Sequence, residues 1–283
     1  MFIVMANNEK KYSVLMSVYE KETPSFLRQS MDSIYNQTVP TDDFVLICDG
    51  KLTDGLYVVI DEMKKKFGSR LRVINRERNV GLGSTLNFGI NECKNKIIAR
   101  MDSDDVSVRD RCEKELEILD KNPEISVVGS FVAEFETSPD ELKSIRKVPE
   151  TQEEILKFVK IRSPMNHPSV MYRKEDVIAA GNYRNVRFCQ DYYLWAKMLA
   201  KGYKLYNIQE PLVLMRENKN SFKRRSGKEY FKIQKQLFQE MRRDGLLNTS
   251  EYYGAVAVRF CSAMAPNWMR KALFKRFMRV EIK

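Results

Sequence analysis

Histidine is almost absent from this chain of 283 residues, because His167 is the only one. A single histidine excludes an HExxH metal site and any mechanism that needs two imidazoles. If the protein is an enzyme, we therefore expect its general base to be a carboxylate. His167 itself, in Asn166-His167-Pro168, allows two interpretations: a hydrogen-bonded loop histidine, or a contact to an anionic substrate group.

Cysteine pairs and long hydrophobic runs are also missing. The five cysteines are an odd number and form no CxxC pair, which favours a reducing cytoplasm and argues against structural zinc. No apolar stretch is long enough to span a bilayer, and the apolar opening residues 1–5 are too few for a signal peptide. We therefore expect a cytoplasmic protein, long enough to bury a sizeable core.

Negative charge is scarce at only one end of the chain. Residues 219–283 contain 16 Lys and Arg against 5 Asp and Glu, a difference equal to the whole net charge of +11. Residues 1–218 contain 33 of each sign and are neutral. This pattern predicts two parts, a domain over 1–218 and a basic helical region over 219–283.

Short apolar runs alternate with helical patterns along the first half of the chain. Five of these runs are typical of buried strands: Ser13–Tyr19, Phe44–Cys48, Leu71–Ile74, Ile97–Met101 and Ile125–Gly129. The alternation predicts βαβ units, and hence an α/β fold with a mostly parallel sheet flanked by helices. In the less regular second half we expect a helix over Asp191–Ala200 and two short strands around Pro211.

Three carboxylates fall within four residues directly after the apolar run Ile97–Ala99, in the segment RMDSDD at 100–105. Like charges this close repel one another, and the usual reason to keep them together is a divalent cation shared with a substrate's phosphates. Asp49 and Glu20 follow two other strands, and parallel sheets bind ligands at the carboxyl ends of their strands. The alternative is an acidic, solvated loop that caps the next helix.

Six short motifs occur in an order typical of one family. They are Met16-Ser17-Val18-Tyr19 with Glu20, Asp49-Gly50, Asn79-Val80-Gly81-Leu82-Gly83, the segment Arg100-Met101-Asp102-Ser103-Asp104-Asp105, Asn166-His167-Pro168-Ser169, and Gln190-Asp191-Tyr192-Tyr193-Leu194-Trp195. With them, residues 12–221 resemble family 2 glycosyltransferases with the GT-A fold. Within that family, the chain is similar to bacterial exopolysaccharide and O-antigen enzymes, including those of the amylovoran-biosynthesis type.

The resemblance implies roles for individual residues. Asp191 matches the catalytic base, Asp49 the residue on the uracil or ribose side, and Asp102 with Asp104 the DxD pair that holds the ribose and a diphosphate-bound Mn²⁺ or Mg²⁺. The implied nucleotide-sugar site comprises Ser17, Val18, Tyr19, Glu20, Asp49, Asn79, Gly81, Arg100, Asp102, Ser103 and Asp104. The implied acceptor side comprises His167, Gln190 and Trp195.

Some of these assignments leave alternatives open. Many family members have two acids where this chain has Cys48-Asp49. Many also place a histidine shortly after an arginine like Arg216, where this chain has Glu217 or Asn218, so the third protein ligand of the metal is open. Without the resemblance, Asp191 would be interpreted as the N-cap of an ordinary amphipathic helix.

The activity that the resemblance implies is an inverting, metal-dependent transfer of a sugar. The expected donor is a UDP-hexose, and the expected acceptor is a hydroxyl of a polyprenyl-diphosphate-linked saccharide in the synthesis of bacterial surface polysaccharide, such as the O-antigen of lipopolysaccharide. One base opposite the leaving group gives a single displacement, so an α-linked donor would yield a β-linkage.

Two other functions fit parts of the sequence. A sugar nucleotidyltransferase also uses strand-end acids and a metal, but Tyr19-Glu20-Lys21-Glu22 after the first strand contains no glycine-rich loop. A nucleic-acid-binding protein would suit the pI of about 9.3. Such proteins place basic residues among stacking aromatics, whereas residues 1–218 have no basic excess and an acidic cluster. We therefore expect no nucleic-acid partner.

Residues 266–283 mix large apolar and basic side chains. Large or small apolar residues recur there at helical spacing, with basic residues between them: Trp268 or Met269, Ala272 or Leu273, and Phe277. The pattern predicts a basic amphipathic helix on an anionic membrane surface, so we expect a peripheral enzyme on the inner face of the cytoplasmic membrane. The alternative is a helix packed on the catalytic domain with a solvated basic face.

Overall fold

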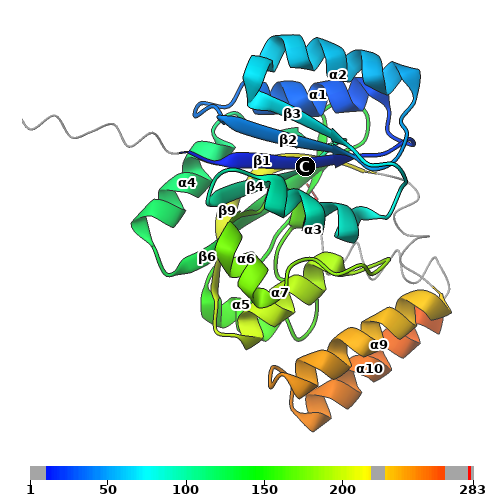
Figure 1. Ribbon diagram of the computed structural model, residues 1–283. Coiled ribbons are helices and arrows are strands. Elements are labelled where there is room, and N and C mark those ends of the chain that lie inside the picture. Colours follow the sequence, from blue (N-terminus) through cyan, green and yellow to red (C-terminus); the bar gives the residue numbers. More distant parts are fainter. Residues whose placement is uncertain (1–10, 218–226, 265–279, 282–283) are drawn as a thin grey trace, which may run out of the picture.

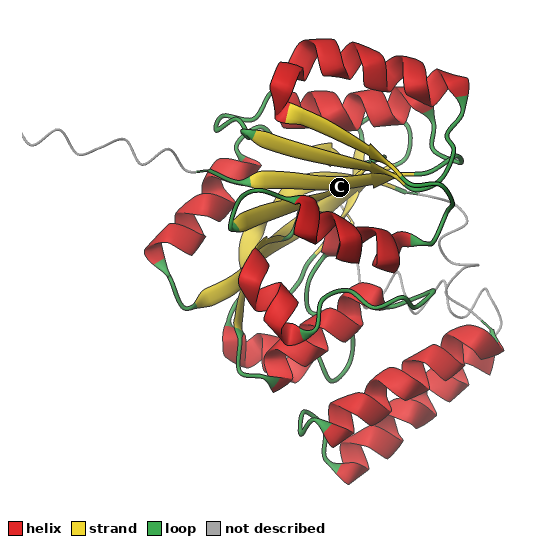
Figure 2. Cartoon of the chain, in the orientation of Figure 1, coloured by secondary structure: helices red, strands yellow, loops and turns green. Residues whose placement is uncertain are grey.

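A computed structural model describes residues 11–217, 227–264 and 280–281 of the chain (Figure 1). One mixed β-sheet runs through the molecule, and helices lie on both of its faces (Figure 2). The strand order along the sheet is β10-β7-β6-β8-β4-β1-β2-β3, and β9 pairs with β6 and β5.

The parallel part of the sheet comes from the first half of the chain, as the alternating pattern predicts. It contains β1 (Ser13–Val18), β2 (Asp43–Cys48), β3 (Leu71–Asn75) and β4 (Ile97–Asp102). Side chains alternate along a strand, so Met16 faces the core under α1 (Pro24–Tyr35) and α2 (Asp54–Phe67), and Leu15 faces the core under α3 (Leu82–Glu92). A short 3₁₀ turn, η1 (Gly68–Arg70), precedes β3.

The second half of the chain adds antiparallel strands. Its elements are β5 (Val106–Ser107), α4 (Arg111–Lys121), β6 (Ile125–Phe135), β7 (Leu142–Arg146), α5 (Gln152–Phe158), η2 (His167–Ser169), β8 (Met171–Arg173), α6 (Lys174–Ala180), α7 (Gln190–Ala200) and β9 (Lys204–Arg216). Because β8 runs antiparallel between β4 and β6, the sheet is mixed beyond β4. The carboxyl ends of β1, β2 and β4 still meet at one edge.

Two strands of the second half are longer than the sequence predicts. β6 continues past Gly129 to Phe135. β9 is one long strand where two short ones are expected, and it pairs with β6 along its length, with register shifts on both sides of the pair Phe131–Pro211. A proline lacks the N–H of a ladder hydrogen bond and is tolerated at such an irregularity, so Pro211 disturbs the pairing without ending the strand.

The described part of the C-terminal region packs on α7. α9 (Lys228–Arg243) and α10 (Thr249–Met264) lie side by side as a hairpin, and Leu237, Phe238 and Met241 of α9 join the core that contains α7. Val280–Glu281 form a short strand, β10, antiparallel to β7. Apart from residues 280–281, the segment 266–283, where a helix is expected, lies outside the described residues. In the described segments we find no helix with the length and apolar character to cross a membrane.

Candidate active site

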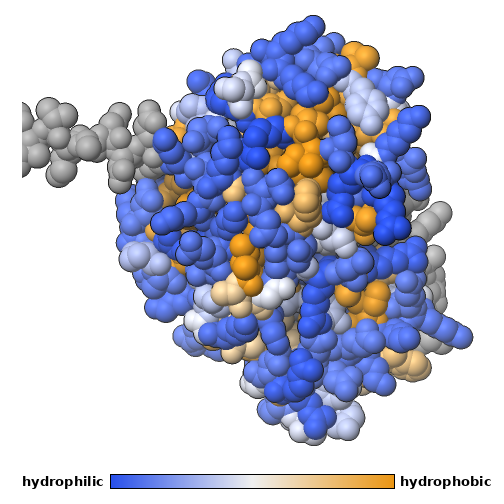
Figure 3. Space-filling model, in the orientation of Figure 1, coloured by the Kyte–Doolittle hydropathy of each residue, from blue (hydrophilic) through white to orange (hydrophobic). Residues whose placement is uncertain are grey.

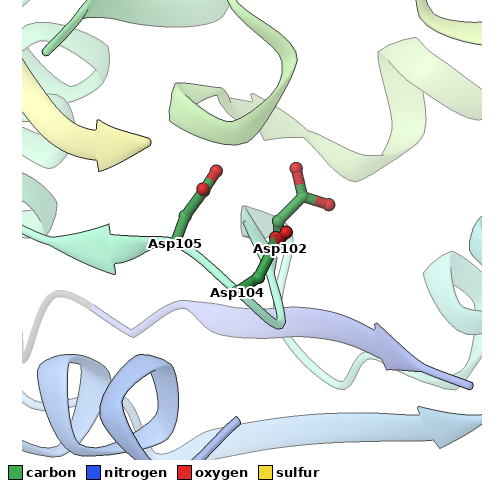
Figure 4. A group of neighbouring side chains, drawn as sticks. All are labelled: Asp102, Asp104 and Asp105. Carbon is green, nitrogen blue, oxygen red and sulfur yellow. The ribbon is translucent and has the colours of Figure 1, made fainter. Parts of the chain in front are cut away.

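Three carboxylates gather on the turn between β4 and β5 (Figure 4). β4 ends at Asp102 and β5 begins at Val106, so Asp104 and Asp105 lie in the turn itself. Each of the three aspartates offers an oxygen within 4.8 Å of the others. The acidic segment at 100–105 is therefore a compact set of oxygen ligands at the carboxyl edge of the sheet.

Arg100 holds the first of these carboxylates. Arg100 is only 1% exposed. Its Nη1 donates a hydrogen bond to Oδ2 of Asp102 at 2.6 Å, and its Nη2 donates one to Oδ1. The hydroxyl of Ser30, on α1, donates to the backbone carbonyl of Asp102 at 2.7 Å. Because Arg100 is buried, it acts on the site by orienting Asp102 and not through an exposed surface of its own.

The rest of the turn is tied to distant segments. The backbone N–H of Arg216, at the end of β9, donates to the carboxylate of Asp105 at 2.9 Å. The hydroxyl of Ser103 donates to the carboxylate of Glu22, just beyond β1. Glu22 thus adds a fourth acid beside the three aspartates. The sequence analysis did not predict Glu22 as a site residue.

The electrostatics of the turn favour a bound cation. Burial, then the charges of Asp102 and Glu22, raise the pKa of Asp104 to about 7. Burial, then the charges of Asp104 and Asp102, raise the pKa of Asp105 well above its ordinary value. A divalent cation would relieve this repulsion, and clustered carboxylate oxygens are the ligands that Mn²⁺ and Mg²⁺ accept. The residues present therefore fit a hard metal ion.

The third acid of this group is Asp105, which belongs to the acidic cluster that the sequence predicted but not to the metal pair that the resemblance implied. Of the two alternatives that the family pattern offered, Glu217 is not part of the group, and Asn218 lies outside the described residues. The resemblance left Asp105 out of the pair because the DxD motif marks only the first and third positions. Its burial, at 2% exposure, becomes apparent only when β9 is in place.

Arg216 is a second residue that the sequence left unassigned. Its guanidinium Nε donates to the carbonyl of Asp104 at 3.2 Å, and Nη2 donates to Gln29 at 2.6 Å. The guanidinium carbon lies 3.8 Å from the ring centroid of Phe26 and 4.5 Å from that of Phe135. These contacts place a cation on the metal side of the site and anchor the end of β9 to the acidic turn.

The loops after β2 and β3 meet at Asp49. The two carboxylate oxygens of Asp49 accept the backbone N–H groups of Val80 and Gly81, each at 3.0 Å. Gly50 has φ +88°, and a Cβ there would lie 2.8 Å from the backbone nitrogen of Asn79. Asp49 therefore shapes the loop at 79–81, and glycine at 50 permits the close approach.

The end of β1 completes this side of the site. Ser17 lies opposite Asp102 in the parallel register of β1 and β4, and Val18 is buried. Tyr19 and Glu20 follow as exposed residues, with Tyr19 at 40% exposure. The expected nucleotide-side residues of β1, β2 and β4 thus share one edge of the sheet.

Tyr183, in the loop before α7, contacts His167 and interacts electrostatically with groups of both the acidic turn and α7. It is buried, and its hydroxyl is 2.8 Å from Nε2 of His167. Burial raises the pKa of Tyr183, the charge of Arg100 opposes this rise, and the charges of Asp191 and Asp102 add to it. Tyr183 is therefore within electrostatic reach of both acids, although no motif pointed to it.

His167 is hydrogen-bonded, as one of its two interpretations held. Burial, then the charge of Arg100, hold the pKa of His167 well below its ordinary value. The other interpretation, a contact to an anionic substrate group, stays a prediction.

Asp191 stands in the first turn of α7. The residue at the N-cap is Cys189, so Asp191 is not the cap. Gln190 packs toward α3, where a Cβ on Gly83 would lie 3.5 Å from the Cβ of Gln190. Trp195, one turn further, is fully buried, and its ring centroid is 6.3 Å from that of His167, so its side chain is not exposed to a substrate.

The sequence matches one family model and several curated proteins. Residues 13–179 match the model described as glycosyl transferase family 2. The chain is 36% identical, over 97% of its length and 99% of the relative, to UDP-Gal:alpha-D-GlcNAc-diphosphoundecaprenol beta-1,3-galactosyltransferase of Escherichia coli. It is 31% identical, over 86% and 91% of the two chains, to the amylovoran biosynthesis glycosyltransferase AmsE of Erwinia amylovora.

Solved structures of similar shape also carry nucleotide sugars. S. aureus TarS in complex with UDP-GlcNAc gives a TM-score of 0.66 at 15% identity, over 89% of this chain and 73% of that one. The mannosyltransferase PcManGT of Pyrobaculum calidifontis, in complex with GDP-Man and Mn²⁺, gives 0.63 at 15% identity, over 94% and 81%. At such low identity the likeness concerns the fold.

Proposed function

The chain belongs to glycosyl transferase family 2, and from this premise we propose that it transfers a hexose from UDP to a hydroxyl of a lipid-linked saccharide, with inversion and with the help of a divalent metal. It is a glycosyltransferase, and its fold is the GT-A fold that the sequence resemblance implied. The observation that carries the proposal is the cluster Asp102, Asp104 and Asp105 at the carboxyl edge of the sheet.

The proposed metal is Mn²⁺ or Mg²⁺, held by Asp104 and Asp102 with Asp105 as the third acid. When bound, the ion would neutralise charge on the departing diphosphate. Arg100 orients Asp102 through its hydrogen bonds, and Asp104 and Asp105, whose pKa values are raised, are the acids that gain most from a cation. The mannosyltransferase structure with Mn²⁺ supports this assignment by its fold.

The donor side is proposed for the residues around the ends of β1 to β4. Asp49 keeps the loop with Asn79 and Gly81 in place beside the nucleotide. Exposed Tyr19 and Glu20 border the same edge. The remaining residues proposed for the donor site are Ser17, Asp102, Ser103 and Asp104, with buried Val18 and Arg100 supporting them from behind. The UDP-Gal donor named for the E. coli relative supports uridine over guanosine.

Asp191 is the proposed catalytic base. It takes the proton of the acceptor hydroxyl while that oxygen forms a bond to the anomeric carbon and the bond from this carbon to the diphosphate oxygen breaks. One displacement from the face opposite the diphosphate inverts the anomeric centre, so an α-linked donor gives a β-linked product. Gln190 would contact the acceptor, while His167 and Trp195 form the packed wall behind it.

The acceptor and the location are proposed together. The E. coli relative is named for a diphosphoundecaprenol-linked GlcNAc acceptor, and AmsE for amylovoran biosynthesis. We place the present chain in the synthesis of a bacterial surface polysaccharide, on the inner face of the cytoplasmic membrane, where such an acceptor presents its sugar. The basic excess of residues 219–283 supports contact with anionic lipid, and no feature of the acidic site favours nucleic acid.

The test of this function is metal-dependent turnover of a nucleotide sugar. The purified protein is incubated with Mn²⁺ and a panel of UDP-, GDP- and dTDP-sugars, and release of the nucleoside diphosphate is measured. We expect release from a UDP-hexose, and its loss in excess EDTA. Asp104→Asn should weaken UDP binding in Mn²⁺ by roughly tenfold or more, because one charged metal ligand is lost.

A matched control is Asp61→Asn on the exposed side of α2, which should bind UDP as the unaltered protein does. Full activity in excess EDTA would exclude a metal-dependent mechanism.

A further inference from the structure

The outer face of α10 is apolar from Tyr253 to Cys261. Residues spaced at i, i+1, i+4, i+5 and i+8 share one side of a helix. Five residues of α10 have this spacing, starting at Tyr253, and all five are exposed. The set is Tyr253, Gly254, Ala257, Val258 and Cys261, with exposed Phe260 beside it. Tyr253 is 63% exposed and Val258 59%. We call these six residues, none of them charged, the α10 face.

A row of exposed cations on α9 borders the α10 face. The row comprises Lys228, Lys232, Lys235 and Arg242, which share one side of their helix. That side lies next to α10, because the rings of Phe231 and Phe260 are 5.6 Å apart and the guanidinium of Arg242 is 5.5 Å from the ring of Tyr252. The cation row and the α10 face therefore form one continuous surface.

The acidic side chains of the hairpin are engaged elsewhere. Each of the four acids at 227–264 forms an ion pair, at 2.7 or 2.8 Å, with a cation of the preceding domain. The pairs are Glu229 with Arg187, Glu240 with Arg184, Asp244 with Lys197, and Glu251 with Lys160. This arrangement turns negative charge toward the domain and leaves positive charge beside the apolar face.

We propose that the α10 face and the cation row dock the enzyme on an anionic lipid bilayer, an inference that rests on the proposed lipid-linked acceptor. Apolar helix faces enter the boundary between headgroups and acyl chains, and flanking lysines bind anionic headgroups. The face of the molecule drawn in Figure 3 is mostly hydrophilic with separate apolar patches. Contiguous exposed apolar surface marks interaction sites, whereas single exposed apolar residues do not. The hairpin packs on α7, so docking also orients the helix that carries Asp191.

A second copy of the chain suits this surface less well. A two-fold contact brings the same patch of both copies together. The cation rows of the two copies would then lie close to each other, and opposing like charges across an interface is unfavourable. An anionic bilayer complements both the apolar and the positive part of the surface.

The test is co-sedimentation of the full-length protein with vesicles of phosphatidylcholine containing 30% phosphatidylglycerol, and with vesicles of phosphatidylcholine alone. We expect binding to the anionic vesicles that weakens as NaCl rises. Val258→Glu should lower the partition coefficient at least tenfold, because it places a charge in the apolar face. The matched control is Val58→Glu on α2, where the valine is 57% exposed, and it should leave binding within twofold.

A second variant probes the charges. Replacing Lys228, Lys232 and Lys235 together by Gln should lower partition by about 100-fold at low salt, since each cation contributes roughly fivefold. Nucleotide-sugar hydrolysis without vesicles should stay unchanged in all these variants. If neither the variants nor the unaltered protein hydrolysed a nucleotide sugar, that result would count against the proposed function and not against docking.

Two results would overturn docking by this surface. The first is that the Val258→Glu variant and the lysine variant bind vesicles as well as the unaltered protein does, while deletion of 266–283 abolishes vesicle binding. The other is a concentration-dependent dimer in sedimentation velocity that Val258→Glu dissociates while vesicle binding is unchanged, which would make the surface a contact between copies.

Discussion

Asp191 is presented by a backbone in an uncommon conformation. Cys189, two residues earlier, has φ +61°, in the left-handed region that non-glycine residues rarely adopt. Such a residue costs on the order of 1–3 kcal/mol and persists only where the surrounding structure enforces it. Here the enforcing contacts include the start of α3, packed against the segment at 184–190. The position of Asp191 is thus set by several elements together.

Asp191→Asn should keep donor binding and lose turnover. Asparagine fills the same space but does not take a proton, so kcat should fall by roughly 10²-fold or more while the affinity for UDP in Mn²⁺ stays the same. Steady-state kinetics and UDP titration measure the two effects. Asp176→Asn, in the first turn of α6, is the matched control and should leave kcat unchanged. If turnover of Asp191→Asn stays within a factor of a few, another residue is the base.

At the scale of elements, the closest approach around the site is between α3 and the loop before α7. A Cβ on Gly83, at the start of α3, would lie 2.0 Å from the backbone carbonyl oxygen of Arg184. A contact that short forces backbone to move. The glycine is therefore needed for packing, and the loop that it admits leads directly into Asp191.

Gly83→Ala should impair both stability and catalysis. Overpacking costs typically about 1–3 kcal/mol, and displacement of the 184–190 segment should lower kcat more than it raises KM. Urea denaturation and steady-state kinetics are the measurements. Gly254→Ala is the control, because its added Cβ meets nothing within 4 Å and removes a glycine from a helix, which should leave stability equal or higher. Unchanged stability and kcat in Gly83→Ala would show that the loop adapts freely.

At the scale of the whole molecule, the acidic turn should make stability depend on pH and metal together. The pKa of Asp104 is raised to about 7 and that of Asp105 is raised also, whereas an unfolded aspartate titrates near 3.9. Between these values the folded chain holds more protons than the unfolded chain. Without metal, the contribution of these groups to the free energy of unfolding therefore falls as pH rises from about 4 to about 7.

Mn²⁺ should offset this loss, since it binds the ionised carboxylates of the folded state. We expect the rise in melting temperature on adding Mn²⁺ to be larger at pH 8 than at pH 5, and to be nearly absent in Asp104→Asn. Thermal unfolding over this pH range, with Mn²⁺ or EDTA, tests the expectation. An equal effect of Mn²⁺ at both pH values, or in the variant, would contradict it.

The parts of the site that could be predicted are those carried by neighbours in sequence. The acids at 102–105 follow an apolar run, and Asp49 follows another, so their place at strand ends follows from local pattern. The strands β6 and β9 were predicted less well. Their full length depends on pairing with each other, and Pro211 is tolerated because a register shift there accommodates it.

By itself, the sequence determined the α/β class, the acidic turn, the charge division at 219 and the family resemblance, because each depends on residue type and short spacing. Only the tertiary structure decided that Asp105 is buried beside β9, that Tyr183 is hydrogen-bonded to His167, and that the acids of the hairpin pair with cations of the preceding domain. The contacts responsible join residues far apart, such as Arg216 and Asp105, 111 positions from each other. No local pattern encodes such a pair, since burial and charge at each end depend on how the distant elements pack.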